Sequence, residues 1–110
     1  MSLPNSHGET PFFLAAEKGN KQSVEFLLDR GAQIECPNKN EDTPLATAAY
    51  QGKYETVKFL LDRGAQLESQ NKKGNTPLVF AALNGHKDTV KLLLDCGANI
   101  ESQNKDGSTP

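Results

Sequence analysis

The side chains that could carry out catalysis or bind a metal are two histidines, two cysteines and two series of regularly spaced carboxylates. Cys36 and Cys96 lie sixty positions apart, without a Cys-x-x-Cys motif or a Cys/His spacing. The sequence therefore indicates neither a disulfide framework nor a zinc site. Reduced thiols are typical of the cytosol and the nucleus, so we expect an intracellular protein. Because no metal-ligand spacing is present, we also expect no metal or other cofactor.

The carboxylates recur with a spacing of 33 residues, as Asp29, Asp62 and Asp95 and as Glu35, Glu68 and Glu101. If successive copies lie on neighbouring helices, they are separated by about 8 to 10 Å. An acid–base pair would also need a substrate cleft between the two groups. The pattern therefore favours a solvated row of charges over a catalytic pair.

The same spacing governs the whole chain and predicts a tandem repeat. The dipeptide Thr-Pro recurs every 33 residues, at 10–11, 43–44, 76–77 and 109–110. The second and third units are identical at 19 of 33 positions, without an insertion or deletion. We interpret the chain as one domain, 1–110, with units 5–37, 38–70 and 71–103 and a partial unit at 104–110. This division predicts that the chain is part of a longer array.

Each unit is expected to form two short antiparallel helices. Thr caps the first helix and Pro occupies its first position, where the missing N–H costs nothing. Apolar residues at i, i+3 and i+4 then make one buried stripe on each helix, and a glycine ends it. The stripes of the first helices are Phe12/Ala15/Ala16, Leu45/Ala48/Ala49 and Leu78/Ala81/Ala82. Those of the second helices are Val24/Leu27/Leu28, Val57/Leu60/Leu61 and Val90/Leu93/Leu94.

The segments between units have Asn first and Gly fourth, which is typical of a type I β-turn. We expect each to project as a turned finger. In the second unit Glu41 replaces the glycine, and Pro37 lacks a backbone donor just before the turn. This finger is expected to be the least regular.

The motifs T-P-F-F-L-A, T-P-L-A-T-A and T-P-L-V-F-A, each followed by G and later by L-L-D-x-G-A, resemble the ankyrin repeat. The likeness covers 5–110 and implies an all-α solenoid of stacked helix-turn-helix units with β-turn fingers. The histidine that the family places after T-P-L is replaced by Phe13, Ala46 and Val79. We therefore expect a free energy of unfolding near the low end of about 5 to 15 kcal/mol.

The resemblance implies a noncatalytic module that binds another protein on the fingers and the outer surface of the first helices. The family's variable contact positions map to Ser6, His7, Glu9, Glu17, Lys18, Lys39, Asn40, Asp42, Tyr50, Gln51, Lys72, Lys73, Asn75, Leu83 and Asn84. Tyr50 and Leu83 share one repeat position outside the buried stripe, which suits a binding hot spot. Their alternative role is packing against the neighbouring helix.

Other features limit the choice of partner. Lys39, Lys72, Lys73 and Lys105 fall in the fingers and are either solvated or able to attract an acidic segment. His7 and His86 fall at different repeat positions, so we expect them not to meet and to be structural or exposed.

A net charge of −2 argues against nucleic-acid binding. The longest apolar run, 78–83, is far too short for membrane insertion. Exposed ends of the stack could allow weak end-to-end self-association. The alternatives are a structural spacer, or the targeting arm of a larger enzyme or channel.

Overall fold

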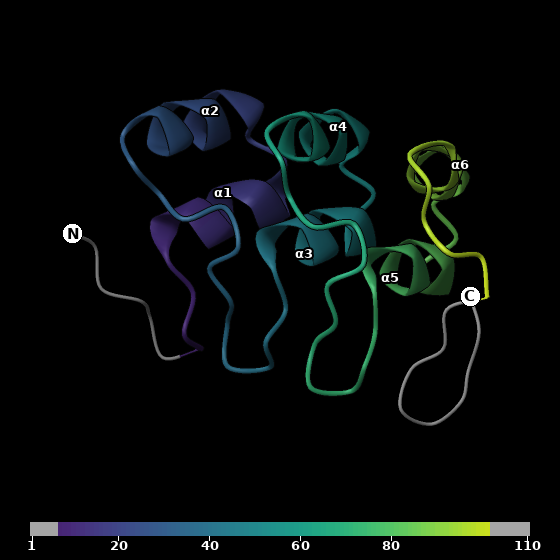
Figure 1. Cartoon of the computed structure of the whole chain (residues 1–110). Coiled ribbons are helices and arrows are strands. Elements are labelled where there is room, and N and C mark those ends of the chain that lie inside the picture. The colour runs from purple at the N-terminus through teal and green to yellow at the C-terminus, as the bar shows by residue number, and fades with distance from the viewer. Residues whose placement is uncertain (1–6, 102–110) are drawn as a thin grey trace.

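Every described Thr-Pro pair begins a helix in the computed structural model, which describes residues 7–101. Within that range six helices follow one another in three pairs and no strand forms (Figure 1). They are α1 (Pro11–Lys18), α2 (Lys21–Asp29), α3 (Pro44–Tyr50), α4 (Tyr54–Asp62), α5 (Pro77–Leu83) and α6 (Lys87–Asp95). The expected all-α repeat fold is confirmed. Ser6 and the partial unit 104–110, with Lys105, lie outside the described residues.

The helix starts follow from the threonine side chains. The hydroxyls of Thr10, Thr43 and Thr76 accept the backbone N–H three residues later at 3.2, 3.1 and 3.3 Å. Each bond satisfies one of the N–H groups that the first helical turn leaves without an internal partner. The first helix of each pair therefore begins at the same repeat position, which aligns the pairs with one another.

The helices form two layers. Figure 1 shows α1, α3 and α5 side by side in an inner layer, α2, α4 and α6 in an outer layer, and the connecting loops projecting from the inner layer. Neighbouring inner helices share a more extensive contact than neighbouring outer helices do. The alanines at the contacting positions explain the difference, because small side chains allow two backbones to approach closely.

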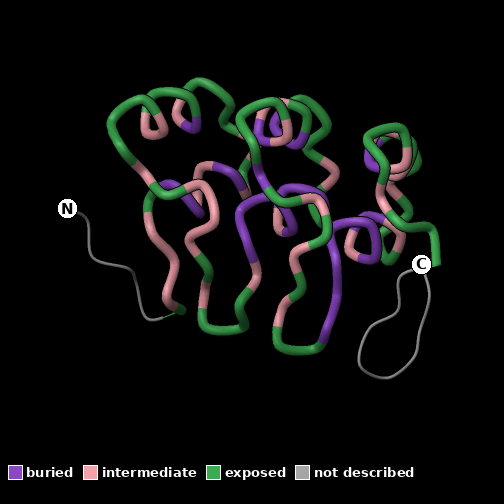
Figure 2. The backbone as a smooth tube through the Cα atoms, viewed as in Figure 1, coloured by how far each residue is buried: buried purple, intermediate pink, exposed green. Residues whose placement is uncertain are grey.

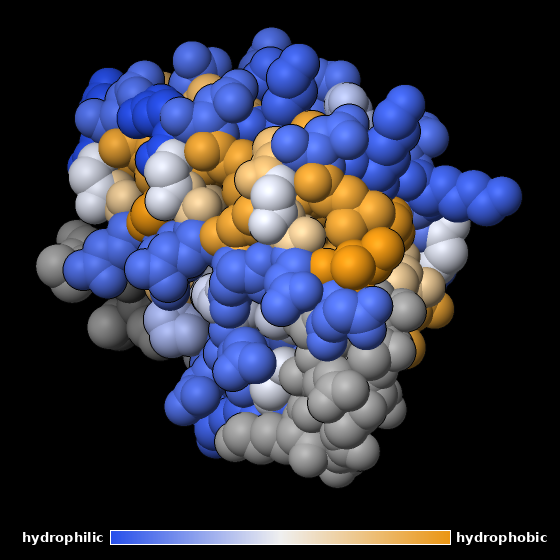
Figure 3. All heavy atoms as spheres, turned by 45° about the vertical axis from the view of Figure 1, so that its right-hand side comes forward, coloured by the Kyte–Doolittle hydropathy of each residue, from blue (hydrophilic) through white to orange (hydrophobic). Residues whose placement is uncertain are grey.

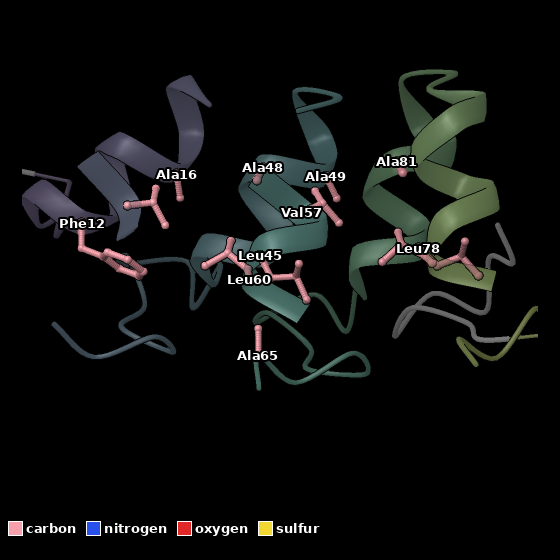
Figure 4. Packing of buried hydrophobic residues seen from close by; sticks show 12 residues of the cluster. Phe12, Ala16, Leu45, Ala48, Ala49, Val57, Leu60, Ala65, Leu78 and Ala81 are labelled. Atoms are coloured by element: carbon pink, nitrogen blue, oxygen red, sulfur yellow. The ribbon is translucent and has the colours of Figure 1, made fainter. Parts of the chain in front are cut away.

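The core runs through the stack rather than through any single pair. Leu45, Ala48 and Ala49 of α3 meet Val57 and Leu60 of α4 at its centre, and all five are buried (Figures 2 and 4). Parts of the predicted stripes are only partly buried, at Leu61 in the middle pair and at Ala15, Leu27, Leu28, Ala82, Val90 and Leu94 in the flanking pairs. The middle pair is the one with a described neighbour on both sides.

The three residues that replace the family's histidine are apolar and buried. Phe13, Ala46 and Val79 expose 1%, 3% and 4% of their surface. At this position the chain therefore uses hydrophobic burial where an imidazole would form hydrogen bonds.

The two complete fingers, 38–42 and 71–75, have the same hydrogen bonds. The carbonyl of Asn38 accepts from the N–H of Glu41 at 3.0 Å, and that of Asn71 accepts from Gly74 at 2.9 Å. Both asparagine side chains also accept two backbone N–H groups of their own finger. The prediction that the first of these fingers is less regular was wrong. Glu41 adopts a left-handed conformation, with φ of 64°, and so completes the turn that glycine makes elsewhere.

This conformation predicts that Glu41→Gly stabilises the protein. Relief of the left-handed conformation, about 1 to 2 kcal/mol, exceeds the extra entropy that glycine loses on folding, about 0.5 to 1 kcal/mol. We expect urea denaturation to show a net gain of about 0.5 to 1 kcal/mol. Gly74→Ala, at the matched position where φ is 81°, should lose about 1 kcal/mol. A lower free energy of unfolding for Glu41→Gly would contradict this explanation of the turn.

Candidate functional site

Backbone hydrogen bonds join the fingers into a row. The N–H of Lys39 donates to the carbonyl of His7 at 3.1 Å, and the N–H of Lys72 donates to the carbonyl of Asn40 at 2.9 Å. The Asp42 carboxylate adds a side-chain link, because it accepts from the amides of Asn38 at 3.1 Å and Asn71 at 2.8 Å. Main-chain hydrogen bonds therefore fix the spacing of the finger tips. The side chains at the tips face solvent.

Large exposed apolar side chains lie at the ends of α3 and α5, and the partly buried Phe80 of α5 lies beside the first of them. Tyr50 is 38% exposed and Leu83 is 66% exposed. The Phe80 ring meets the Tyr50 ring edge-on, with centroids 5.7 Å apart and planes at 87°. We call Tyr50, Phe80 and Leu83 the apolar strip. Both roles considered for Tyr50 are present, since its ring contacts the neighbouring helix and still faces solvent.

Phe80 was not among the predicted contact residues. Its position three residues before Leu83 on α5 places both side chains on one side of that helix. The i, i+3 spacing was therefore a usable signal. The repeat position shared by Tyr50 and Leu83 does not reveal Phe80, because the residue equivalent to Phe80 in the second unit is Thr47.

The backbone beneath the apolar strip is held from the next helix pair. The carbonyl of Tyr50 lies 2.8 Å from Nε2 of His86 and 2.8 Å from the donating amide of Asn84. The His86 ring also fills the space beside Gly52, where an added Cβ would lie 2.5 Å from Nδ1. His86 is thus structural, as expected, and joins α6 to the end of α3, whereas His7 lies in a finger.

Most of the other predicted contact residues are accessible. The side chains of His7, Lys18, Lys39, Asn40, Gln51, Lys72, Lys73 and Asn84 are exposed, and those of Glu9, Glu17 and Asp42 are partly buried. The prediction that Asn75 is a contact residue is corrected, because only 8% of its surface is exposed. Its N–H and carbonyl both bond to Asn71, at 3.0 and 3.1 Å, which turns the residue into the finger. Asn75 therefore has a structural role.

The charges on the finger tips are mainly positive. Lys39, Lys72 and Lys73 are exposed there. Glu41 adds one exposed carboxylate, whereas both oxygens of Asp42 are engaged by asparagine amides. An approaching chain would thus meet three ammonium groups beside the inner helices.

The regularly spaced carboxylates connect successive units. Asp29 forms an ion pair with Arg63 at 3.2 Å. The Glu35 carboxylate accepts the N–H of Gln66 at 2.7 Å, and that of Glu68 accepts the N–H of Asn99 at 2.8 Å. The expected solvated row did not include these two exposed hydrogen bonds, through which each glutamate binds the backbone of the following unit. Across residues 7–101 no three His, Cys, Asp or Glu side chains are grouped so that they could hold a metal ion.

The two cysteines are free and differ in environment. Cys96 is exposed, whereas Cys36 is partly buried with its Sγ 3.3 Å from the Thr10 hydroxyl. Burial raises the pKa of the Cys36 thiol above its usual value, and the hydrogen bond with Thr10 only partly offsets that rise.

Comparison with known families agrees with this geometry. Residues 1–71 match the family model described as ankyrin repeats in three copies, and residues 73–105 match the model of the single ankyrin repeat. No curated protein matches the chain. Among residues 7–101, every helix is too short or too polar to cross a lipid bilayer.

The glutamate bonds between units predict a measurable loss of stability when they are removed. Glu35→Ala and Glu68→Ala should each lower the free energy of unfolding by about 0.5 to 1.5 kcal/mol, the usual net value of one hydrogen bond. Glu101→Ala is the matched control, because no described unit follows Glu101. Equal effects of all three substitutions in urea denaturation would show that the bonds between units contribute nothing specific.

The cysteine environments predict different reactivities. At mildly alkaline pH, iodoacetamide should modify the exposed Cys96 faster than Cys36, because only the thiolate reacts and the raised pKa of the partly buried Cys36 lowers its thiolate fraction. Mass mapping of the alkylated peptides measures both rates. In concentrated urea the two rates should converge. A faster reaction at Cys36 in the folded chain would contradict its burial and its raised pKa.

Proposed function

Because this chain belongs to the ankyrin repeat family, we propose that it binds a partner protein on the face made by the fingers and the inner helices. Ankyrin repeats are generally protein–protein interaction modules and are typically noncatalytic. Repeat stacking supports the proposal on physical grounds, because it yields an extended surface that backbone bonds hold rigid.

The observation that carries the proposal is the apolar strip on the inner helices α3 and α5, whose first turns follow the lysine-bearing fingers. Large apolar groups left exposed on a protein surface often mark a binding site. Aromatic side chains are enriched among residues that dominate binding energy. Tyr50 also presents a ring that Phe80 already holds edge-on, so little side-chain freedom remains to be lost on binding.

The chemistry of this face favours a particular partner. We propose an acidic segment that carries one or two large apolar side chains. Its apolar groups would contact the apolar strip, and its carboxylates would face Lys39, Lys72 and Lys73. Such charges mainly accelerate association and select the partner, whereas the apolar contacts supply most of the affinity.

The proposed contact set also includes polar residues of the fingers and inner helices. These are His7, Glu9, Glu17, Lys18, Asn40, Asp42, Gln51 and Asn84, together with Ser6, which lies outside the described residues. We propose that the whole chain acts as one domain in the units given above. An intracellular location is proposed because both cysteines are free.

The test is to select random displayed peptides on the immobilised chain and to measure the affinity of the enriched sequences. We expect acidic peptides with aromatic or aliphatic anchors. Tyr50→Ala and Leu83→Ala should each weaken binding by more than about 1 kcal/mol, the threshold usual for hot-spot residues. Thermal unfolding should change little, because both side chains are exposed.

Tyr54→Ala is the matched control. Tyr54 is 37% exposed, almost as much as Tyr50, but it begins the outer helix α4. Its loss should leave peptide affinity unchanged. The proposal fails if no peptide is enriched, which would favour the role of a spacer, or if Tyr54→Ala weakens binding as much as Tyr50→Ala. A large loss of stability in Tyr50→Ala or Leu83→Ala would assign those side chains to the core.

A further inference from the structure

Asn84 is the one asparagine of the sequence that is followed by glycine. Asparagine is a thermolabile residue, because the nitrogen of the next peptide bond can attack its side-chain amide. A following glycine has no Cβ beside that nitrogen, so the attack is least hindered there. The other described asparagines precede lysine, glutamate, threonine or isoleucine. The peptide bond between Asn84 and Gly85 is therefore where this chemistry is most favoured.

Asn84 and Gly85 lie at the end of α5, and both are exposed. In the second unit Gln51 and Gly52 occupy the same repeat positions, at the end of α3. The amide of glutamine is one methylene further from the main chain, so the attack there has to close a larger ring and is slower. The second unit thus presents the same arrangement with a less reactive side chain.

The Asn84 amide joins the third unit to the second. Its Nδ2 donates to the carbonyl of Tyr50 at 2.8 Å. This carbonyl lies in the last turn of α3, where helical carbonyls have no partner within the helix. Nε2 of His86 lies 2.8 Å from the same oxygen. Because Tyr50 belongs to the apolar strip, Asn84 helps to fix the backbone that carries the strip.

Two hydrogen bonds restrain the attack in the folded chain. The Gly85 N–H, which must lose its proton, donates to the carbonyl of Ala82 at 3.1 Å, and the Asn84 amide is held by Tyr50. Both bonds lie at the end of a helix of only seven residues. Helix ends open locally at a much smaller free-energy cost than the core does. The attack therefore needs only the end of α5 to open, while the rest of the stack stays folded.

We propose that Asn84 is a site of spontaneous deamidation, and that this modification loosens the apolar strip. When the end of α5 opens, the Gly85 nitrogen forms a bond to Cγ of Asn84. The bond between Cγ and Nδ2 breaks, and ammonia leaves with the proton from the Gly85 nitrogen. Water then opens the cyclic imide at either of its carbonyls. The products are aspartate and isoaspartate at position 84.

Either product lacks the donor that the Tyr50 carbonyl accepts. A carboxylate oxygen then faces the carbonyl oxygen, and two acceptors repel each other. Isoaspartate also lengthens the main chain by one methylene just after Leu83, which shifts the turn between α5 and α6. His86 keeps its contact with the Tyr50 carbonyl, so the end of α3 is loosened rather than released.

The modification also adds a negative charge at the end of α5. The side of the stack that carries α5 and α6 comes forward in Figure 3, where a belt of hydrophobic atoms lies between hydrophilic zones. The new charge opposes the acidic partner proposed above, because like charges repel. This effect on binding rests on the proposed function, whereas the deamidation and the loosening of α3 do not.

Peptide mapping by mass spectrometry tests the modification on the full chain after incubation at mildly alkaline pH. Asn84 should convert faster than any other described asparagine, and Gln51 should remain intact. Asn20 is the internal control, because it is exposed but is followed by lysine. Asn84→Gln should abolish the reaction at this position. Conversion of Asn20 as fast as that of Asn84 would overturn the proposed site.

Amide hydrogen exchange tests the loosening of α3 without any partner. In Asn84→Asp the amide of Gly52, which donates to Ala49, should exchange about two- to tenfold faster than in the wild type, the effect of losing one hydrogen bond. The amide of Gly19, which donates to Ala16 at the matched position of α1, should exchange as before. The deamidated chain, separated from the unmodified chain by ion exchange, should behave like Asn84→Asp. Unchanged exchange at Gly52 in both samples contradicts the loosening.

Affinity for the peptides selected on the immobilised chain gives the third measurement. Asn84→Asp should bind them about two- to tenfold more weakly, whereas circular dichroism should show an unchanged fold. If no peptide is enriched, the proposed function fails, and mapping and hydrogen exchange still decide this proposal. If peptides are enriched and Asn84→Asp binds them as tightly as the wild type does, deamidation does not regulate the apolar strip and the proposal is wrong.

Discussion

The packing of each inner helix against the next is the contact on which the rest of the structure depends. A pair of short helices has too little surface to bury its own apolar stripe, so each stripe is buried against neighbouring pairs. Leu45, Ala48 and Ala49 of α3 lie in this position and are almost inaccessible to solvent. The alanines keep the inner layer close, whereas the outer helices make fewer contacts with one another.

Polar contacts then fix how one unit sits on the next. Glu35 and Glu68 bind backbone N–H groups of the following unit, His86 bonds to the end of α3, and the fingers share main-chain bonds. Each of these contacts restricts the movement of one unit relative to the next. Exposed side chains that take no part in these bonds, such as those of Tyr50 and Leu83, can vary with little loss of the fold, although the Tyr50 ring also packs edge-on against Phe80. The candidate binding face is made of such positions.

The sequence predicted those parts of the structure that depend on local chemistry. Thr-Pro starts, glycine stops and apolar spacing are properties of a few consecutive residues, and the helices, caps and most of the core agree with them. The errors concern contacts between units. The roles of Glu35 and Glu68 and the pairing of Phe80 with Tyr50 require knowing how far apart two units lie, whereas Asn75 is turned into its own finger by its bonds to Asn71. Glu41 was misjudged for another reason, since the Asn38 turn determines the backbone there despite the cost of a left-handed residue.

The central claim is that contacts between units, rather than the core of any one unit, hold the binding face in place. Residue-resolved amide hydrogen exchange of the free chain tests it directly. Slowest exchange is expected in α3, which has described neighbours on both sides, and faster exchange is expected in α2 and α6 at the ends of the outer layer. Equal protection of all six helices, or protection greatest in α2 or α6, would contradict the account.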